Sequence, residues 1–151
     1  MREIFIYDTG SECPIIEFFK CTNAKVRNKL KYQLEYIKDE RNPLCAPHVK
    51  HFSIEKYRQM YELRIKASGT MVRVIFHMHN DEITFLHAFV KRDRKDTERA
   101  LETALRILQS ILQDNGEVKN WANICLRESL SSLLCQRDTS HQAVTLLYCA
   151  E

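Results

Sequence analysis

The sequence predicts an α+β fold: an N-terminal strand and a helical hairpin pack on a small twisted antiparallel meander, followed by a C-terminal helix. Three observations predict this class. Apolar and polar residues alternate over three successive segments between 61 and 91, as they do in half-buried strands. Apolar residues recur at helical spacing over 23–41 and again over 97–112. The chain has 151 residues, 44% of them hydrophobic, which suits one domain with a real core.

The N-terminal region reads as a strand followed by two helices. Residues 2–7 alternate well enough for a short strand. Ser11 can cap a short helix, and Pro14 fits its first turn because the missing N–H is not needed there. Asn23 can cap a longer helix that ends before Pro43. The apolar face of this longer helix comprises Val26, Leu30, Leu34 and Ile37.

The middle of the chain reads as a meander that leads into a helix. The predicted strands are Tyr61–Lys66, Met71–Met78 and Ile83–Lys91, with turns at Ser68-Gly69 and Asn80-Asp81. Asp96 or Thr97 then caps a helix that presents an apolar face. That face comprises Leu101, Ala104, Leu105, Leu108 and Leu112.

The last part of the chain gives a weaker pattern. Residues 118–134 suggest a further amphipathic helix, and 143–149 a final strand. We therefore assign residues 1–113 to one domain and 114–151 to a C-terminal extension, which we expect to pack on the same domain.

Charge and composition limit the class of protein. The net charge is +3, but residues 41–95 alone carry eleven Lys and Arg against five Asp and Glu, or +6. Such a basic region either attracts an anionic partner or forms an ordinary solvated surface. No apolar run is long enough for a membrane helix, and the N-terminus lacks a signal-peptide pattern, so we expect a cytoplasmic protein. The six cysteines form no C-x-x-C pair, so we expect reduced thiols and no metal site.

Strand parity predicts what the two faces of the sheet carry. Leu86, Ala88 and Val90 form a uniformly apolar set suited to packing under the N-terminal helices. The opposite sets place cations and aromatic rings on one common surface. This surface comprises Arg64, Arg73, His87 and Lys91, together with Phe85 and Phe89. Cations that hold phosphates and rings that stack on unpaired bases are typical of RNA recognition, and with a histidine they can support phosphoryl chemistry.

Structural alternatives remain for each of these side chains. Arg64 can pair with Glu62 or Glu55 in a surface bridge. His87 can be a half-buried histidine, and the two phenylalanines can form a second small core under the last helix. Arg73 lies between two valines in a central strand, so it needs an anion or a carboxylate as its partner.

Three motifs in order carry a resemblance. The segments Tyr61–Arg64, Met71–Phe76 and Phe85–Arg92 are similar to those of the phage-derived, HigB-like branch of the RelE/ParE toxin superfamily. The resemblance covers about residues 1–113 and implies a compact α+β toxin of a type II toxin–antitoxin pair. HigB-like relatives cut messenger RNA, generally on the ribosome and without metal, whereas ParE-like relatives poison DNA gyrase. The usual partner is a small helix-turn-helix antitoxin.

The resemblance also implies roles for individual residues. Arg64 and Arg73 match the two family arginines, Lys91 matches the first lysine after the aromatic residue, and Arg92 replaces the second. His87 stands where this branch often has a histidine. The resulting hypothesis is an endoribonuclease with no cofactor. Its catalytic residues are Arg73, His87, Lys91 and Arg92, and its substrate-binding residues are Arg64, Lys66, Phe89 and Lys95.

Two departures and one alternative accompany this hypothesis. The extension is longer than is usual in the family. A late proton-transfer group has only His141 and Tyr148 as candidates. The alternative is a non-catalytic interaction protein of the same superfamily, either a gyrase inhibitor or an inactive phage-derived relative.

Overall fold

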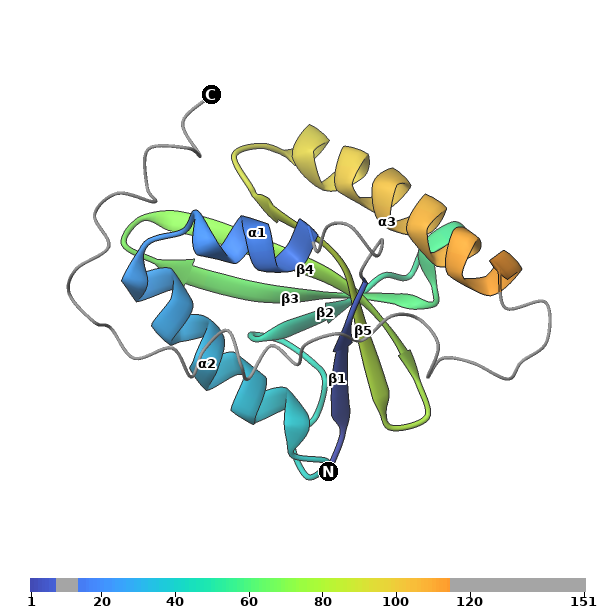
Figure 1. Cartoon of the computed structure of the whole chain (residues 1–151), viewed down its shortest axis with the longest axis horizontal. Coiled ribbons are helices and arrows are strands. Elements are labelled where there is room, and N and C mark those ends of the chain that lie inside the picture. The colour runs from blue at the N-terminus through green and yellow to red at the C-terminus, as the bar shows by residue number, and fades with distance from the viewer. Residues whose placement is uncertain (8–13, 115–151) are drawn as a thin grey trace.

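The computed structural model describes residues 1–7 and 14–114, which form one five-stranded sheet with helices on both faces (Figure 1). The strands are β1 (Glu3–Ile6), β2 (Val49–His51), β3 (Met60–Ala67), β4 (Thr70–His79) and β5 (Glu82–Val90). The helices are α1 (Pro14–Lys20), α2 (Ala24–Lys38) and α3 (Arg94–Asp114), with a 3₁₀ turn, η1, at Glu55–Tyr57. The predicted α+β class, helical hairpin, meander and last helix are confirmed.

The structure contains the local features from which the helix starts and the hairpin turn were predicted. Pro14 is the first residue of α1, and the Asn23 side chain accepts a 2.9 Å hydrogen bond from the backbone N–H of Val26 at the start of α2. The β3–β4 turn has positive φ angles at Ser68 (51°) and Gly69 (76°), as a tight hairpin turn requires. Alternation and turn residues therefore predicted each strand of the meander to within one residue at either end.

The start of α3 corrects one prediction. Neither Asp96 nor Thr97 is the capping residue. The helix begins at Arg94, and the Asp93 side chain accepts from the backbone N–H of Asp96 at 3.0 Å. The Asp96 carboxylate in turn accepts from the N–H of Asp93 at 3.1 Å and from that of Arg92 at 2.8 Å. This reciprocal capping box begins three residues earlier than the apolar periodicity indicates.

The sheet order is β1-β5-β4-β3-β2. The predicted meander is confirmed, since β3, β4 and β5 pair antiparallel with their neighbours in sequence. The edge strand β1 instead pairs parallel with β5, so the sheet is mixed rather than purely antiparallel. The short strand β2, which lies in a segment of few alternating residues, adds the opposite edge beside β3.

Two separate cores lie on the two faces of the sheet. The larger core joins α1 and α2 to all five strands, and the smaller core joins α3 to β3, β4 and β5. The larger core comprises Ile4, Ile6, Ile15, Ile16, Phe19, Val26, Leu30, Leu34, Ile37, Val49, Leu63, Ile65, Val72, Val74, Phe76, Ile83, Phe85 and Ala88. The smaller core comprises Phe52, Met60, Ile75, Leu86, Ala100, Leu101, Ala104, Leu108 and Ile111.

A β-bulge corrects the predicted parity of β5. The register between β4 and β5 shifts between Ile75 and Phe76. Phe85 consequently belongs to the larger core, and Leu86 belongs to the smaller core under α3. The uniform set of Leu86, Ala88 and Val90 does not form, because an extra residue in one strand moves the following side chains to the opposite face. Phe85 is fully buried and is absent from the surface on which parity placed it.

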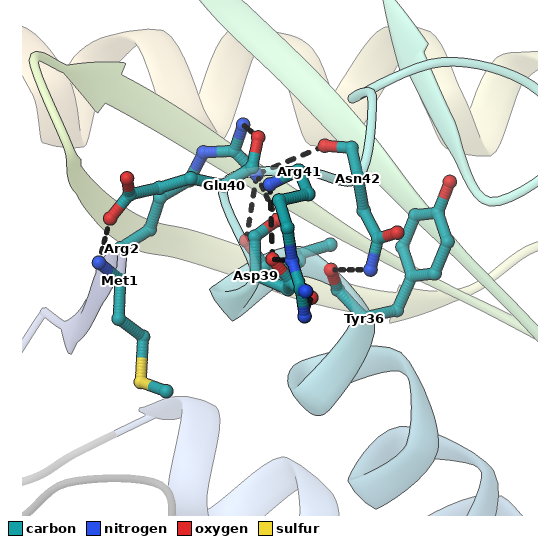
Figure 2. Close-up of polar contacts among 8 residues, drawn as sticks. Met1, Arg2, Tyr36, Asp39, Glu40, Arg41 and Asn42 are labelled. Carbon is teal, nitrogen blue, oxygen red and sulfur yellow. Dashed lines mark hydrogen bonds and ion pairs between the residues drawn. The ribbon is translucent and has the colours of Figure 1, made fainter.

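The end of α2 is attached to the N-terminal strand mainly through the Arg2 side chain, beside an ion pair between Glu40 and the Met1 amine (Figure 2). The Arg2 guanidinium donates to the backbone carbonyls of Ile37 (3.1 Å), Asp39 (3.0 Å), Glu40 (3.2 Å) and Asn42 (3.2 Å). These carbonyls lie at or just beyond the last turn of α2, where helical partners are missing. A cation there also complements the helix dipole, so Arg2 both ends α2 and attaches it to β1.

Several expectations lie outside the described residues: the Ser11 cap, the helix over 118–134, the strand over 143–149, and the packing of the extension. Within the described ranges, no helix is long and apolar enough to cross a membrane. Cys21 is disulfide-bonded, which contradicts the expectation of a reduced thiol at this position, whereas Cys45 is free and exposed.

Candidate functional site

The meander aligns three cross-strand rows on the α3 side of the sheet. Arg64 pairs with Arg73, and Arg73 pairs with Phe89. One row on, Lys66 pairs with Met71, whose carbonyl accepts from the backbone N–H of Lys91 at 2.7 Å. In the row on the other side, Glu62 pairs with Ile75 and Ile75 with His87. Because side chains two residues apart share a face, these rows form one surface. We call Arg64, Lys66, Arg73, His87, Phe89 and Lys91 the basic face.

A buried carboxylate holds the two arginines of this face. Glu62 Oε1 lies 3.2 Å from Arg64 Nε and 3.4 Å from Arg73 Nε. The exposed fraction of the side chain is 2% for Glu62, 11% for Arg73 and 35% for Arg64. The carboxylate therefore lies beneath the surface, Arg73 lies just above it, and Arg64 reaches solvent. The triad carries a net charge of +1 on the side that faces water.

The triad is held together by charge more than by hydrogen bonds. Arg64 donates to Glu62, whereas Arg73 Nε and Glu62 Oε2 are buried and have no hydrogen-bond partner. Arg73 Nη1 donates to the backbone carbonyls of Val72 (3.0 Å) and Ile65 (3.5 Å). Burial lowers the pKa of Arg73 from its ordinary value, the Glu62 charge opposes this shift, and the Arg64 charge adds to it. Of the two expected partners for Arg73, an anion or a carboxylate, the fold thus supplies a carboxylate.

His87 and Phe89 form the aromatic part of the basic face. Their ring centroids are 6.1 Å apart and their planes differ by 12°. Both side chains are half-buried, and Phe89 also packs against the smaller core, as the structural alternative for this ring proposed. Burial lowers the pKa of His87 below its ordinary value of about 6.5, so the imidazole is neutral at pH 7. Among the described residues its ring nitrogens have no hydrogen-bond partner.

The remaining predicted site residues surround the start of α3. Lys91 is half-buried, whereas Arg92 and Lys95 are exposed. The side chains of these three residues and of Lys66 form no close ion pair within the described part of the chain, although the charge of Arg92 acts on Asp96. The Asp93–Asp96 capping box fixes the backbone that carries them. The fold thus brings Lys66 and Lys91 into adjoining rows, while Arg92 and Lys95 lie beyond the end of β5.

Sequence reasoning found most of this site but missed the double role of Glu62. The pairing of Arg64 with Glu62 was one of two alternatives, and it is the one that forms, since Glu55 pairs with Arg58 instead at 3.2 Å. That the same carboxylate also holds Arg73 depends on the cross-strand register. A signal was present, because Glu62 lies two residues before Arg64 and therefore on the same strand face.

Metal-ligating side chains do not gather at this site. Within residues 1–7 and 14–114, no group of three or more His, Cys, Asp or Glu is arranged to hold a metal ion. The basic face itself carries guanidinium, ammonium and imidazole groups. These groups bind and neutralise phosphates and move a proton.

Comparison with known proteins supplies the family. Neither a curated protein nor a solved structure matches the chain. The family described as Phage derived protein Gp49-like (DUF891) matches residues 17–109, more than half of the chain. This range includes α2, the strands β2–β5 and most of α3, and therefore every residue of the basic face. The chain belongs to the Gp49-like family of phage-derived proteins, a RelE/ParE-like toxin family of toxin–antitoxin systems.

Proposed function

We propose that this protein is the toxin of a type II toxin–antitoxin pair and that it cuts messenger RNA on the ribosome, as HigB-like toxins do. The observation that carries the proposal is the basic face, where cations of adjoining rows lie beside a neutral imidazole and a half-buried ring. A phosphate backbone with unpaired bases is the ligand that such a surface fits best.

Each side chain of the basic face has a role in the proposed reaction. Arg64, Lys66 and Lys91 contact the phosphates, because the side chain of Lys66 is exposed and those of Arg64 and Lys91 are only half-buried. Arg73 acts from beneath through its charge, since Glu62 and its burial keep it from direct contact. Phe89 stacks on a base. Arg92 and Lys95 bind the RNA beyond the scissile phosphate.

The proposed chemical step is attack by the 2′-hydroxyl on the neighbouring phosphate. His87 takes the proton of the 2′-hydroxyl, the 2′-oxygen bonds to phosphorus, and the bond from phosphorus to the 5′-oxygen breaks. The 5′-oxygen leaves with a proton from solvent, and a 2′,3′-cyclic phosphate remains. The cations stabilise the charge that develops on the phosphate oxygens, and binding on the ribosome supplies the alignment.

The partner in this proposal is an antitoxin of the helix-turn-helix type, acting in the cytoplasm. An antitoxin is expected from the family, and acidic side chains on it would complement the basic face. By covering Arg64 and Lys91, such a partner would block access of RNA to the phosphate-binding groups.

The proposal is tested with purified full-length protein in a bacterial translation extract. New 5′ ends within translated message are expected for the parent protein. In Arg64→Ala the cleavage rate should fall about 10²- to 10³-fold, the usual effect of removing one charge-stabilising donor. Arg58→Ala removes an exposed arginine outside the basic face and serves as the matched control, with cleavage unchanged.

A second function is favoured by one observation. Because Arg73 is mostly buried and paired with Glu62, the basic face could serve binding alone, as in a gyrase inhibitor. Loss of supercoiling by gyrase without any RNA cleavage would establish that function and contradict the nuclease. Silence in both assays would indicate an inactive relative.

A further inference from the structure

The outer face of α2 is a second strongly basic surface. The helix carries five Lys and Arg against one acidic residue, Glu35, which pairs with Lys38 at 3.9 Å. Its apolar side is buried in the larger core, and Arg27 is half-buried and donates to the backbone carbonyl of Thr22, so three lysines remain on the outer side. Lys25 and Lys31 are exposed, Lys29 is half-exposed, and none of the three has an acidic partner among the described residues.

Aromatic rings continue the stripe that Lys25 and Lys29 begin. Positions 25, 29, 32 and 36 follow one another at helical spacing along one side of α2. The Tyr32 ring lies 4.9 Å from Lys29 Nζ and is 58% exposed, which is unusual for a large aromatic side chain. Its hydroxyl has no partner within the part of the chain that the structure describes.

His48, from the loop before β2, extends the aromatic surface. Its ring centroid lies 4.5 Å from that of Tyr36 and 6.4 Å from that of Tyr32. Gln33 Nε2 and His48 Nδ1 are 2.9 Å apart, so a buried amide holds the imidazole in place. The Oε1 atom of Gln33 is buried and has no hydrogen-bond partner. Three rings thus lie in a row on a rigid support, with lysines at one end.

This surface and the basic face lie on opposite sides of the sheet. The α2 helix packs on the larger core, whereas the basic face belongs to the side that α3 covers in part (Figure 1). A short oligonucleotide bound at one surface cannot contact the other without passing around the edge of the sheet. The two surfaces can therefore be tested independently.

We propose that the outer face of α2 is a second binding site, which takes single-stranded RNA. The lysines contact the phosphates of the RNA. An unpaired base stacks on the Tyr32 ring and displaces the Lys29 ammonium from it. The displaced ammonium then contacts a phosphate. The residues of the site are Lys25, Lys29, Tyr32, Tyr36 and His48. An exposed ring favours a single strand over a duplex, because only unpaired bases present their faces for stacking.

The test measures binding at α2 with the basic face disabled. The background is the full-length Arg64→Ala/Lys66→Ala/Lys91→Ala variant, and the probe is a fluorescein-labelled 12-nucleotide RNA followed by anisotropy. Tyr32→Ala in this background should weaken binding about 5- to 100-fold, whereas Tyr32→Phe keeps the ring and should bind as the background does. Replacing Lys25 and Lys29 with glutamine should lower the magnitude of the salt slope by about 1.4.

Three outcomes would overturn this proposal: equal binding by the Tyr32→Ala variant, equal affinity for the same sequence as a duplex, and equal affinity for a poly-glutamate peptide. The last two would indicate a charged surface without stacking. Since cleavage is not measured here, failure of the proposed nuclease activity leaves the result of this test unaffected. Thermal unfolding of each variant confirms that the fold is kept.

Discussion

The two faces of the sheet bury different kinds of side chain. The face under α1 and α2 is apolar along its whole length, from Ile4 in β1 to Val49 in β2. The other face is apolar only where α3 covers it. Beyond α3 it changes to Glu62, Arg64 and Arg73, a triad with one fully buried carboxylate oxygen that has no hydrogen bond.

This difference separates stability from function in the molecule. A continuous apolar core stabilises a fold in proportion to the area that it removes from water. A buried ion triad, in contrast, contributes little net stability, because desolvation of the charges opposes their attraction. A buried ion triad that adds little stability is therefore expected only on the face of the sheet whose charges serve binding or chemistry.

The largest effect is expected at the buried carboxylate. Glu62→Ala leaves two guanidinium groups without their counter-charge, and we expect the free energy of unfolding to fall by about 3–5 kcal/mol. Urea unfolding followed by circular dichroism measures this loss. Glu98→Ala, in the exposed pair with Arg94, is the control and should change stability little. A Glu62→Ala variant as stable as the parent would show that the triad is not a structural unit.

The converse change sharpens the comparison. Replacing all three residues, as Glu62→Leu with Arg64→Met and Arg73→Met, removes the charges together and should leave stability equal or higher. The same variant should lose RNA cleavage. Stability and activity that fell together would contradict the separation between the two faces.

A smaller effect is expected in the core under α3. Leu108→Ala should lower the free energy of unfolding toward the lower end of about 2–5 kcal/mol, because this core is small and can relax around the gap. Hydrogen exchange should show faster opening of α3 amides with the β4 amides still protected. Leu30→Ala, in the larger core, is the matched variant and should expose α2 and the strands together.

The smallest effect concerns pH. Because burial lowers the pKa of His87 in the folded protein, the unfolded chain binds more protons at mildly acidic pH. The stabilising contribution is full above pH 6.5 and is lost as pH falls through the folded pKa. His87→Gln should therefore make the fall in stability between pH 7 and pH 5 shallower, as urea midpoints at each pH will show. His77, whose pKa burial also lowers, remains in both proteins, so part of the slope should persist.

The elements that could be predicted are those with strong local signals. The strands β3, β4 and β5 follow from alternation between glycine- and asparagine-containing turns, and α2 follows from the Asn23 cap and its apolar stripe. The strand β2 has three residues and exists because β3 offers an edge, so no local pattern could reveal it. The bulge beside Phe76 is set by how β4 and β5 fit together.

The sequence predicted which residues the candidate site contains, but not how deeply each side chain is buried. Parity correctly placed Arg64, Arg73 and His87 on one face, and the cost of burying a charge required an anion or a carboxylate beside Arg73. Parity misplaced Phe85, because the bulge reverses its side. The difference in exposure between the two arginines arises from the position of Glu62 below them, which depends on tertiary packing.

The parallel pairing of β1 with β5 bears on how the protein is made. Glu3 lies opposite Glu82 in the register, and Ile6 opposite Phe85, so the first strand finds its neighbour only after almost all of the sheet has been synthesised. Pairing between segments so distant in sequence is slow compared with hairpin formation. The meander can form first, and the insertion of β1, with Arg2 at the end of α2, completes the molecule. A growing chain that stops before residue 82 thus lacks both the β1–β5 pairing and the β5 residues of the basic face.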